Sequence, residues 1–333
     1  MVLSICRVVV VRQPTLPRVA RVLSTTEGAH RGAFTPLDWI VFVAIGAIWG
    51  SSFLLIAIGL EAFQPGLITW LRVVVGAAVL RLVPAARTPV ARDDRARFAA
   101  VSILWVAIPF TLFPLAQTAV SSAVAGMLNG GVPVVTAVVA SVWLGRLPGR
   151  LQLVGLVLGL AGVVMIALPA AGEGSSEAIG VLLVVIAVLC YGVAINIVGP
   201  LQQRYGAAAV MARVLMLGAI WTAPFGAASI ETSSFSWPAL AAVLALGAIG
   251  TGFAFAFMAR FVGRVGGTRA SFATYLIPVV ALVLGVTIRG DDVATVAVLG
   301  VALVIAGAFL ASRPEPGSAN RSGPAVPAVP PAP

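Results

Sequence analysis

Ten apolar segments dominate the sequence, most of them close to the roughly 20 residues that a helix needs to cross a bilayer. Sixty per cent of the 333 residues are apolar and ten per cent are charged, so the chain lacks the polar surface of a soluble protein of this length. We therefore expect an all-α integral membrane protein with ten transmembrane helices. The expected segments are 38–60, 66–83, 98–117, 121–144, 151–169, 178–201, 207–227, 237–262, 267–288 and 293–312.

Glycines and prolines that recur at one constant spacing indicate that the chain is internally duplicated. Residues 267–307 match residues 122–162 without a gap, and such a fixed register across two segments is typical of a duplication. We expect two five-helix repeats, 36–170 and 178–312. Because five is odd, the second repeat must cross the membrane in the opposite sense, as in many secondary transporters. The matched pairs are Pro133/Pro278, Gly145/Gly290, Gly155/Gly300 and Gly162/Gly307.

Arginine supplies all 21 basic residues, and its distribution predicts the orientation of the chain. With the N-terminus in the cytoplasm, 18 of the 21 arginines fall in the two tails and in the loops after the second, fourth, sixth and eighth segments. Cytoplasmic loops carry such an excess. We expect an inner-membrane protein with both termini in the cytoplasm, and the net charge of +10 then requires no nucleic-acid partner. The basic tail 1–35 and the Pro/Ala-rich tail 313–333 are expected to be disordered.

Several short motifs occur in a fixed order in the two halves. The first half contains Ile48–Phe53 (IWGSSF), Ala125–Leu128 (AGML) and Val132–Val134 (VPV); the second contains Gly266–Ser271 (GGTRAS) and Tyr275–Val279 (YLIPV). On these motifs the chain resembles the EamA-type carriers of the drug/metabolite transporter (DMT) superfamily over residues 38–312. The resemblance implies ten helices, a central substrate pathway, and secondary transport of a small metabolite or amphipathic compound.

One position departs from that family's usual pattern, in which Gly-Glu ends the fourth and ninth segments. Gly290 is followed by Asp291, so the second half keeps an acid, whereas Gly145 is followed by Arg146, which reverses the charge. The resemblance implies that the acid anchors or gates a helix end. The first half lacks that group.

Two arginines lie inside apolar segments, Arg72 in the second and Arg213 in the seventh. An arginine in a membrane span costs at least a few kcal/mol and normally faces protein or water. One interpretation is an anion-binding or gating charge at each end of a substrate pathway. The other is a side chain that reaches the interface or bonds free helix carbonyls and so locks the bundle. Arg213 is closer to a cytoplasmic end, where the second role is easier.

Trp49 and Tyr191 occupy equivalent positions near the middle of the first and sixth segments, and a glycine follows each of them. Aromatic residues with polar atoms usually lie at the membrane interface, so we expect this pair to line a central cavity. Ordinary aromatic packing is the alternative. The glycines, Gly50 and Gly192, would let a neighbouring helix or a substrate approach closely.

Further polar side chains are expected along the same pathway. Asn129 and Thr274 each lie four residues before a proline, Pro133 or Pro278, and we expect those prolines to break the fourth and ninth helices and act as hinges. Serines in such helices often bond their own backbone, so Ser51 and Ser52 are weaker candidates. Gln117 is expected at the outer rim with a solvated side chain. The full set of pathway candidates is Trp49, Ser51, Ser52, Arg72, Asn129, Tyr191, Asn196, Arg213, Thr274 and Tyr275.

These features together favour a secondary transporter that exports a small metabolite, an amino-acid-like solute or an amphipathic compound by alternating access. A channel or a membrane scaffold is the alternative, followed by a lipid-modifying enzyme. No Asp, Glu or His lies in the middle of a segment, so proton coupling has no visible carrier, and exchange or uniport has equal weight. We expect no catalytic residues, no metal and no cofactor, because no nucleotide loop or ligand cluster occurs. The sequence leaves the oligomeric state open.

Overall fold

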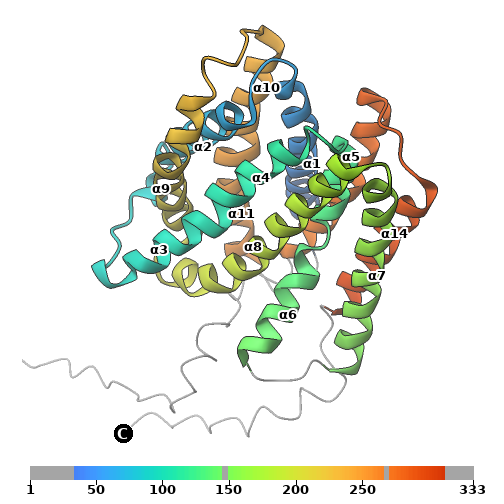
Figure 1. The fold of residues 1–333 in the computed structure, drawn as a ribbon. Helices are drawn as coiled ribbons and strands as arrows, with labels where there is room; N and C mark the ends of the chain where they lie inside the picture. Colours follow the sequence, from blue (N-terminus) through green and yellow to red (C-terminus); the bar gives the residue numbers. More distant parts are fainter. Residues whose placement is uncertain (1–33, 145–148, 266–269, 312–333) are drawn as a thin grey trace, which may run out of the picture.

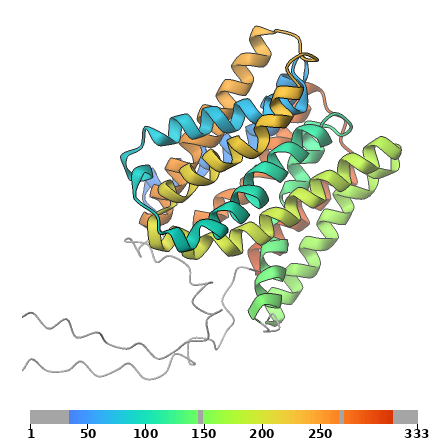
Figure 2. The same cartoon turned by 60° about the vertical axis from the view of Figure 1, so that its left-hand side comes forward.

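The computed structural model describes residues 34–144, 149–265 and 270–311, and in these ranges the fold is entirely helical (Figures 1 and 2). The predictions for Gly145, Arg146 and Arg269 and for most of both tails lie outside the described residues. The helices of the first half are α1 (Pro36–Leu60), α2 (Pro65–Arg81), η1 (Pro84–Arg87), η2 (Arg92–Asp94), α3 (Arg95–Val101), η3 (Ser102–Ala107), α4 (Ile108–Ala116), α5 (Ser122–Asn129), α6 (Val132–Leu144) and α7 (Arg150–Gly172).

The second half repeats this order. Its helices are α8 (Ser175–Tyr205), α9 (Ala207–Ala228), α10 (Trp237–Gly247), η4 (Ala248–Phe253), α11 (Ala254–Val265), η5 (Phe272–Leu276), α13 (Ile277–Leu284), η6 (Gly285–Arg289) and α14 (Thr295–Ala311). We call the end of the bundle with Leu60, Ser122 and Arg289 the outer end, and the end with Pro36 and Tyr205 the inner end, after the orientation that the arginines predict.

Local signals in the sequence explain where several helices begin. Thr35 and Asp38 form a capping box at the start of α1, in which the Thr35 hydroxyl accepts from the Asp38 amide and the Asp38 carboxylate accepts from the Thr35 amide. Pro36 and Pro65 stand at the first position of α1 and α2, where a missing amide hydrogen costs nothing. The Ser121 hydroxyl caps α5 by accepting from the Val124 amide.

Eight helical stretches in the described part of the chain are long and apolar enough to cross a membrane, fewer than the ten expected. The shortfall lies in the second and tenth segments. Residues 295–310 form a shorter apolar helix, and α2 has 17 residues, which corresponds to about 26 Å against a hydrocarbon core of about 30 Å. The expected all-helical membrane architecture is confirmed, while the count of ten crossings stays a prediction.

Reciprocal glycine contacts show that α7 and α14 run antiparallel. A β-carbon on Gly162 would lie 2.5 Å from the Gly300 carbonyl oxygen, and one on Gly307 would lie 2.5 Å from the Gly155 carbonyl oxygen. These four glycines form the matched pairs Gly155/Gly300 and Gly162/Gly307. Replacing each glycine by its counterpart in the other half therefore turns the first contact into the second. The two helices lie side by side in Figure 1, and only glycine lets their backbones approach this closely.

Contacts elsewhere in the bundle follow the same exchange of halves. Helix α2 packs on α9, and α2 packs on η4 as α9 packs on η3. Both η3 and η4 are single stretches of π-helix, at matching places in the two halves, inside otherwise α-helical spans. The repeat therefore includes an irregular feature that apolar composition alone would not produce.

Contacts at the two ends of the bundle break the exchange. At the outer end α5 packs closely on α13, where a β-carbon on Gly126 would lie 2.1 Å from the Ala281 β-carbon. The related pair at the inner end is α6 and η5, and within the described residues these two do not pack on each other to a comparable extent. Within the described residues, the fourth and ninth segments thus pack more closely at the outer end than at the inner end.

Candidate functional site

Aromatic side chains from both halves meet in the middle of the bundle. The rings of Trp49 and Phe255 have centroids 5.8 Å apart, and those of Tyr191 and Phe113 are 5.9 Å apart. The first contact joins the first and eighth segments, and the second joins the sixth and third, so the two are related by the exchange of halves. Trp105 extends the group, with its ring 6.2 Å from Phe255. Trp49 and Tyr191 are both half-buried.

Glycines beside the two aromatic residues hold their helices against the proline-containing segments. A β-carbon on Gly50 would lie 2.5 Å from the Val280 β-carbon, and one on Gly192 would lie 2.4 Å from a Val135 γ-carbon. Val135 and Val280 each lie two residues after one of the matched prolines, so this pair of contacts is also repeat-related. The partner that approaches each glycine is a neighbouring helix.

Arg72 is buried inside the protein, with 7% of its surface exposed. Its Nε donates to the Thr251 hydroxyl at 3.1 Å, and its guanidinium carbon lies 3.7 Å from the centre of the Phe110 ring. Thr251 belongs to the π-helical stretch η4. A cation held over an aromatic face in a dry site is stabilised by about 2 kcal/mol or more.

A side chain of the facing helix also bonds the π-helical stretch of the first half. Trp221 on α9 donates from Nε1 to the Ser102 hydroxyl of η3 at 3.0 Å, as Arg72 on α2 donates to Thr251 of η4. Stretches of π-helix occur often at functional sites. Nothing in the sequence pattern indicated either stretch.

Arg213 bonds the backbone at the inner end. Its guanidinium donates to the carbonyl oxygens of Ala86 at 3.1 Å, Thr88 at 2.6 Å and Ala209 at 3.0 Å. These bonds fix the segment after α2 to α9. They match the second of the two interpretations, an arginine that locks the bundle.

Most of the smaller polar candidates bond nearby backbone. Ser51 and Ser52 both donate to the Ile48 carbonyl, at 2.9 and 3.2 Å, and Thr274 donates to the Ser271 carbonyl at 2.7 Å. Such bonds within one helix are common for hydroxyl side chains in membranes.

Asn196 and Tyr275 instead link different segments. Asn196, which is 5% exposed, donates to the carbonyls of Thr136 at 3.1 Å and Gly192 at 2.8 Å, and so joins α8 to α6. Tyr275 donates its hydroxyl to the Ala308 carbonyl at 3.0 Å and so joins η5 to α14. Both side chains hold the fourth or ninth segment to a neighbour.

The two prolines stand where their helices change course. Pro133 is the second residue of α6, after the interruption at Gly130 and Gly131, and Pro278 is the second residue of α13, after the 3₁₀ helix η5. Asn129 ends α5, and its Oδ1 is buried without a hydrogen-bond partner among the described residues. Whether these positions act as hinges stays a prediction.

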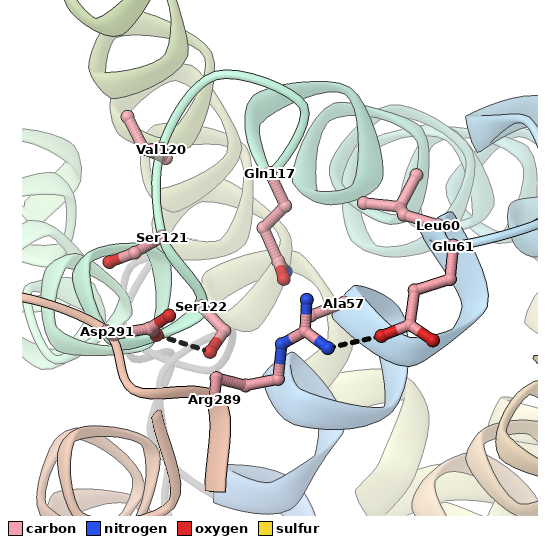
Figure 3. Close-up of a pocket in the computed structure, with 9 residues that line it drawn as sticks. All are labelled: Ala57, Leu60, Glu61, Gln117, Val120, Ser121, Ser122, Arg289 and Asp291. Carbon is pink, nitrogen blue, oxygen red and sulfur yellow. Dashed lines mark hydrogen bonds and ion pairs between the residues drawn. The ribbon is translucent and has the colours of Figure 1, made fainter. Parts of the chain in front are cut away.

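A polar pocket at the outer end was not anticipated from the sequence (Figure 3). It encloses about 210 Å³ between the ends of α1, α4 and η6 and the start of α5. The lining residues are Ala57, Leu60, Glu61, Gln117, Val120, Ser121, Ser122, Arg289 and Asp291. Ala57 and Gln117 lie four residues, or one helical turn, beyond Phe53 and Phe113 of the central region. The pocket therefore lies directly above the aromatic group.

Two interactions close the outer end around this pocket. Arg289 forms an ion pair with Glu61 at the end of α1. Asp291 accepts from the Ser122 hydroxyl at 2.7 Å and from the Ala123 amide at 2.9 Å, which places its carboxylate at the start of α5. A carboxylate there is favoured by the free amides and dipole of the helix. Asp291 is the acid after Gly290, and its contacts are those of a helix-end anchor.

Gln117 is at the rim, as predicted, but the expected solvated amide is wrong. Both polar atoms of its side chain are buried and have no hydrogen-bond partner among the described residues. Figure 3 shows the side chain pointing toward Arg289. No sequence pattern indicates an amide without partners at this position.

Ion pairs at the inner end are a further feature that sequence reasoning missed. Asp94 is buried and accepts from Arg204 at 2.9 Å, Arg97 at 3.2 Å and the Tyr205 hydroxyl at 2.6 Å. These bonds tie the start of the third segment to the end of the sixth. Partners in opposite halves of the chain cannot be read from a sequence pattern.

Asp38 forms a second inner ion pair, with Arg264 at 2.7 Å. It joins the start of α1 to the end of α11, and the Asp38 side chain is almost fully buried.

The described residues contain no group of three His, Cys, Asp or Glu side chains able to hold a metal ion.

The helices, their apolar surfaces and the enclosed aromatic group define a multi-pass membrane protein built from two similar halves. The chain belongs to the EamA-like transporter family, whose model matches residues 37–168 and again residues 178–313. Membership of this family indicates a membrane transporter rather than an enzyme. The resemblance found in the sequence motifs is confirmed.

Relatives of known sequence match nearly their full length. An "Uncharacterized transporter" of Archaeoglobus fulgidus is 22% identical over 83% of this chain and 98% of its own, and YoaV of Bacillus subtilis, also named an uncharacterized transporter, is 24% identical over 80% and 94%. A "Probable terminal-alkyne amino-acid exporter" of Streptantibioticus cattleyicolor is 25% identical over 83% and 93%. A solved crystal structure that is 20% identical and covers 84% of this chain and 97% of its own has a TM-score of 0.57, which supports the fold.

Proposed function

We propose that the protein is a secondary transporter that moves a small organic solute by alternating access between two inverted five-helix repeats. The observation that carries this proposal is that the two halves have similar architectures but pack differently at the two ends of the bundle. Some helix contacts exchange when the halves exchange, as those of α2 with η4 and of α9 with η3 do. Within the described residues, however, α5 packs on α13 at the outer end, while α6 and η5 do not pack to a comparable extent at the inner end. Two similar halves that swap these arrangements would open the centre to each side in turn.

The inverted arrangement of ten crossings is part of this proposal. It is supported by the antiparallel glycine contacts of α7 with α14, and by the two matches of the family model, which support the repeat boundaries 36–170 and 178–312. The arginine distribution supports an inner-membrane location with both tails in the cytoplasm.

The closed layer beneath the outer pocket favours a carrier over a channel. Phe53 and Phe113, 5% and 3% exposed, pack with ring centroids 5.3 Å apart, and Gly126 packs against Phe53 and Ala281. A channel needs a continuous wet path, whereas a carrier needs one end closed while the other is open.

The proposed solute class is a small metabolite, an amino-acid-like solute or an amphipathic compound, and the proposed direction is export. The aromatic group supports a solute with apolar surface, and Arg72, which lies over the Phe110 ring inside the bundle, supports a polar or anionic group on that solute. The exporter named among the relatives is consistent with this class and direction, at 25% identity.

Counterflow in proteoliposomes tests the proposal. Purified protein is reconstituted, the vesicles are preloaded with an unlabelled solute, and entry of the same labelled solute is followed for amino acids, nucleosides and amphipathic cations. A carrier gives saturable entry that is faster into preloaded than into empty vesicles. Entry that does not saturate supports the channel, and no entry across the panel supports the scaffold.

A further inference from the structure

Arg81, the last residue of α2, is exposed and forms no ion pair with the described residues. Its Nη1 donates to the Met216 sulfur of α9 at 3.5 Å, and its guanidinium forms no other hydrogen bond with the described residues. A thioether sulfur is a weak acceptor, whereas a guanidinium offers five hydrogens. The charge of Arg81 and most of its donors are therefore left without a partner in the part of the chain that the structure describes.

The surface around this guanidinium is apolar. On α2, Val74 lies two helical turns before Arg81 on the same face, and it is exposed. On α9, Ile220 lies one turn beyond Met216, and both side chains are exposed. Leu82, which follows Arg81, is 73% exposed. A continuous exposed apolar surface of this kind on a membrane protein contacts the acyl chains of lipids.

The contact with Met216 sets the depth of the Arg81 guanidinium. Arg213, three residues nearer the inner end of α9, already bonds the carbonyls of Ala86 and Thr88 in the segment after α2. Met216 lies nine residues after the first residue of α9, which corresponds to about 14 Å along the helix. The guanidinium is thus held against the exposed side of α9, short of its inner end. A charge beside acyl chains is costly unless an anion or water meets it.

Carboxylates of the inner end do not supply that anion within the described residues. Asp38 and Asp94 are engaged by other arginines, and Asp93 is exposed on η2 and forms no ion pair there. The cytoplasmic leaflet of a membrane, by contrast, carries anionic lipid headgroups, and basic sites between transmembrane helices bind them. Here the two helices are α2 and α9, which pack along each other.

We propose that the face of α2 and α9 around Arg81 binds an anionic phospholipid of the inner leaflet. The guanidinium would donate two hydrogen bonds to the phosphate, a pairing that suits its planar shape. The acyl chains would lie along Val74, Met216 and Ile220. A soluble phosphate compound would meet the charge and leave the apolar surface uncovered, so a lipid is the occupant that fits both. The site faces the bilayer and is separate from the proposed solute pathway.

Lipid titration of the purified full-length protein in a neutral detergent tests the site. Phosphatidylglycerol and phosphatidylcholine with identical acyl chains are added separately, bound lipid is counted by native mass spectrometry, and Tm is recorded. We expect one phosphatidylglycerol molecule to bind at least about fivefold more tightly, the factor that one basic residue contributes near anionic lipid, and to raise Tm. Inorganic phosphate at the same concentration should leave Tm unchanged, because it has no acyl chains.

Substitutions at Arg81 identify the group that selects the headgroup. Arg81→Gln should lower the affinity for phosphatidylglycerol to that for phosphatidylcholine, while Arg81→Lys should keep the preference, because an ammonium also binds phosphate. Arg97→Gln is the matched control. It removes the same charge from the same end, but Arg97 is already paired with Asp94, so the preference for phosphatidylglycerol should stay as in the wild type.

The inference is overturned if the wild-type protein binds the two lipids equally, a comparison that needs no variant. It is also overturned if Arg81→Gln keeps the wild-type preference, or if Arg97→Gln loses as much of it as Arg81→Gln does, since net charge alone would then explain the binding. A rise in Tm with inorganic phosphate as large as that with phosphatidylglycerol would assign the site to a soluble anion and contradict the lipid.

Discussion

Adding one methyl group at Gly126 should open the outer end of the bundle. A β-carbon at this position would lie 2.1 Å from the Ala281 β-carbon and 3.0 Å from Phe53 Cδ2. Carbon atoms in contact prefer a separation of about 3.5–4.0 Å, so α5 and α13 would have to separate by about 1.4 Å or more. Overpacking of this kind costs about 1–3 kcal/mol.

That cost falls on the outer-closed state alone, because only this state brings α5 and α13 together. A difference of about 1–3 kcal/mol between two states changes their ratio by a factor of about 5 to 150. Gly126→Ala should therefore raise the population of the outer-open state by that factor. The fold should persist, since a state with α5 and α13 apart is part of the proposed cycle.

Pulsed electron paramagnetic resonance between spin labels on Thr118→Cys and Thr287→Cys measures this change. Both positions are exposed, at the outer ends of the third and ninth segments. The native Cys6 and Cys190 are first replaced. In Gly126→Ala we expect a longer distance between the two labels to appear. The fraction of molecules with this distance should follow from the change of about 5- to 150-fold in the ratio of the outer-open to the outer-closed state.

Gly263→Ala is the matched control, because a β-carbon there meets no atom within 4 Å. Its distance distribution should equal that of the parent protein. The reasoning is refuted if Gly126→Ala inserts normally, unfolds at the parent temperature and gives the parent distribution as well.

Three further predictions follow from single contacts. Arg72→Ala should abolish transport and leave membrane insertion unchanged, checked by counterflow and by the amount of protein in purified membranes; normal transport would remove Arg72 from the pathway. Arg213→Ala should keep transport and lower stability by about 1–3 kcal/mol, because carbonyls of the segment after α2 lose a charged donor, which a shift in Tm would show. Asp291→Asn should weaken the bonds to Ser122 and Ala123 and lengthen the outer spin-label distance, and an unchanged distance would contradict its role as an anchor.

The membrane architecture and the duplication could be predicted because their causes are local. Apolar runs near the length of a bilayer crossing must be helical to satisfy their own backbone, and this holds without knowledge of any contact. The glycines that recur at a constant spacing could be matched by register, and the contacts of Gly162 with Gly300 show what they do. Pro133 and Pro278 were predicted to break helices because proline removes a backbone donor, and each starts a new α-helix.

The polar chemistry of the ends could not be predicted, since its partners are far apart in sequence. Glu61 and Arg289 lie 228 residues apart in the sequence, and their pairing depends on how the first and ninth segments pack. Gln117 was assigned a solvated side chain because it lies at the outer end of an apolar segment, but the packing around it buries both polar atoms of the amide. Asp291 was singled out by its place after Gly290, although only the structure shows that it meets the start of α5.

The central claim is that the pathway is open to one side at a time. It is tested by measuring two spin-label distances in the same preparation conditions, the outer pair at Thr118 and Thr287 and an inner pair at Val142 and Ser271. Alternating access predicts opposite responses: Gly126→Ala lengthens the outer distance and shortens the inner one by matching fractions. A long outer distance together with an unchanged long inner distance would describe a pore open at both ends and would contradict the account.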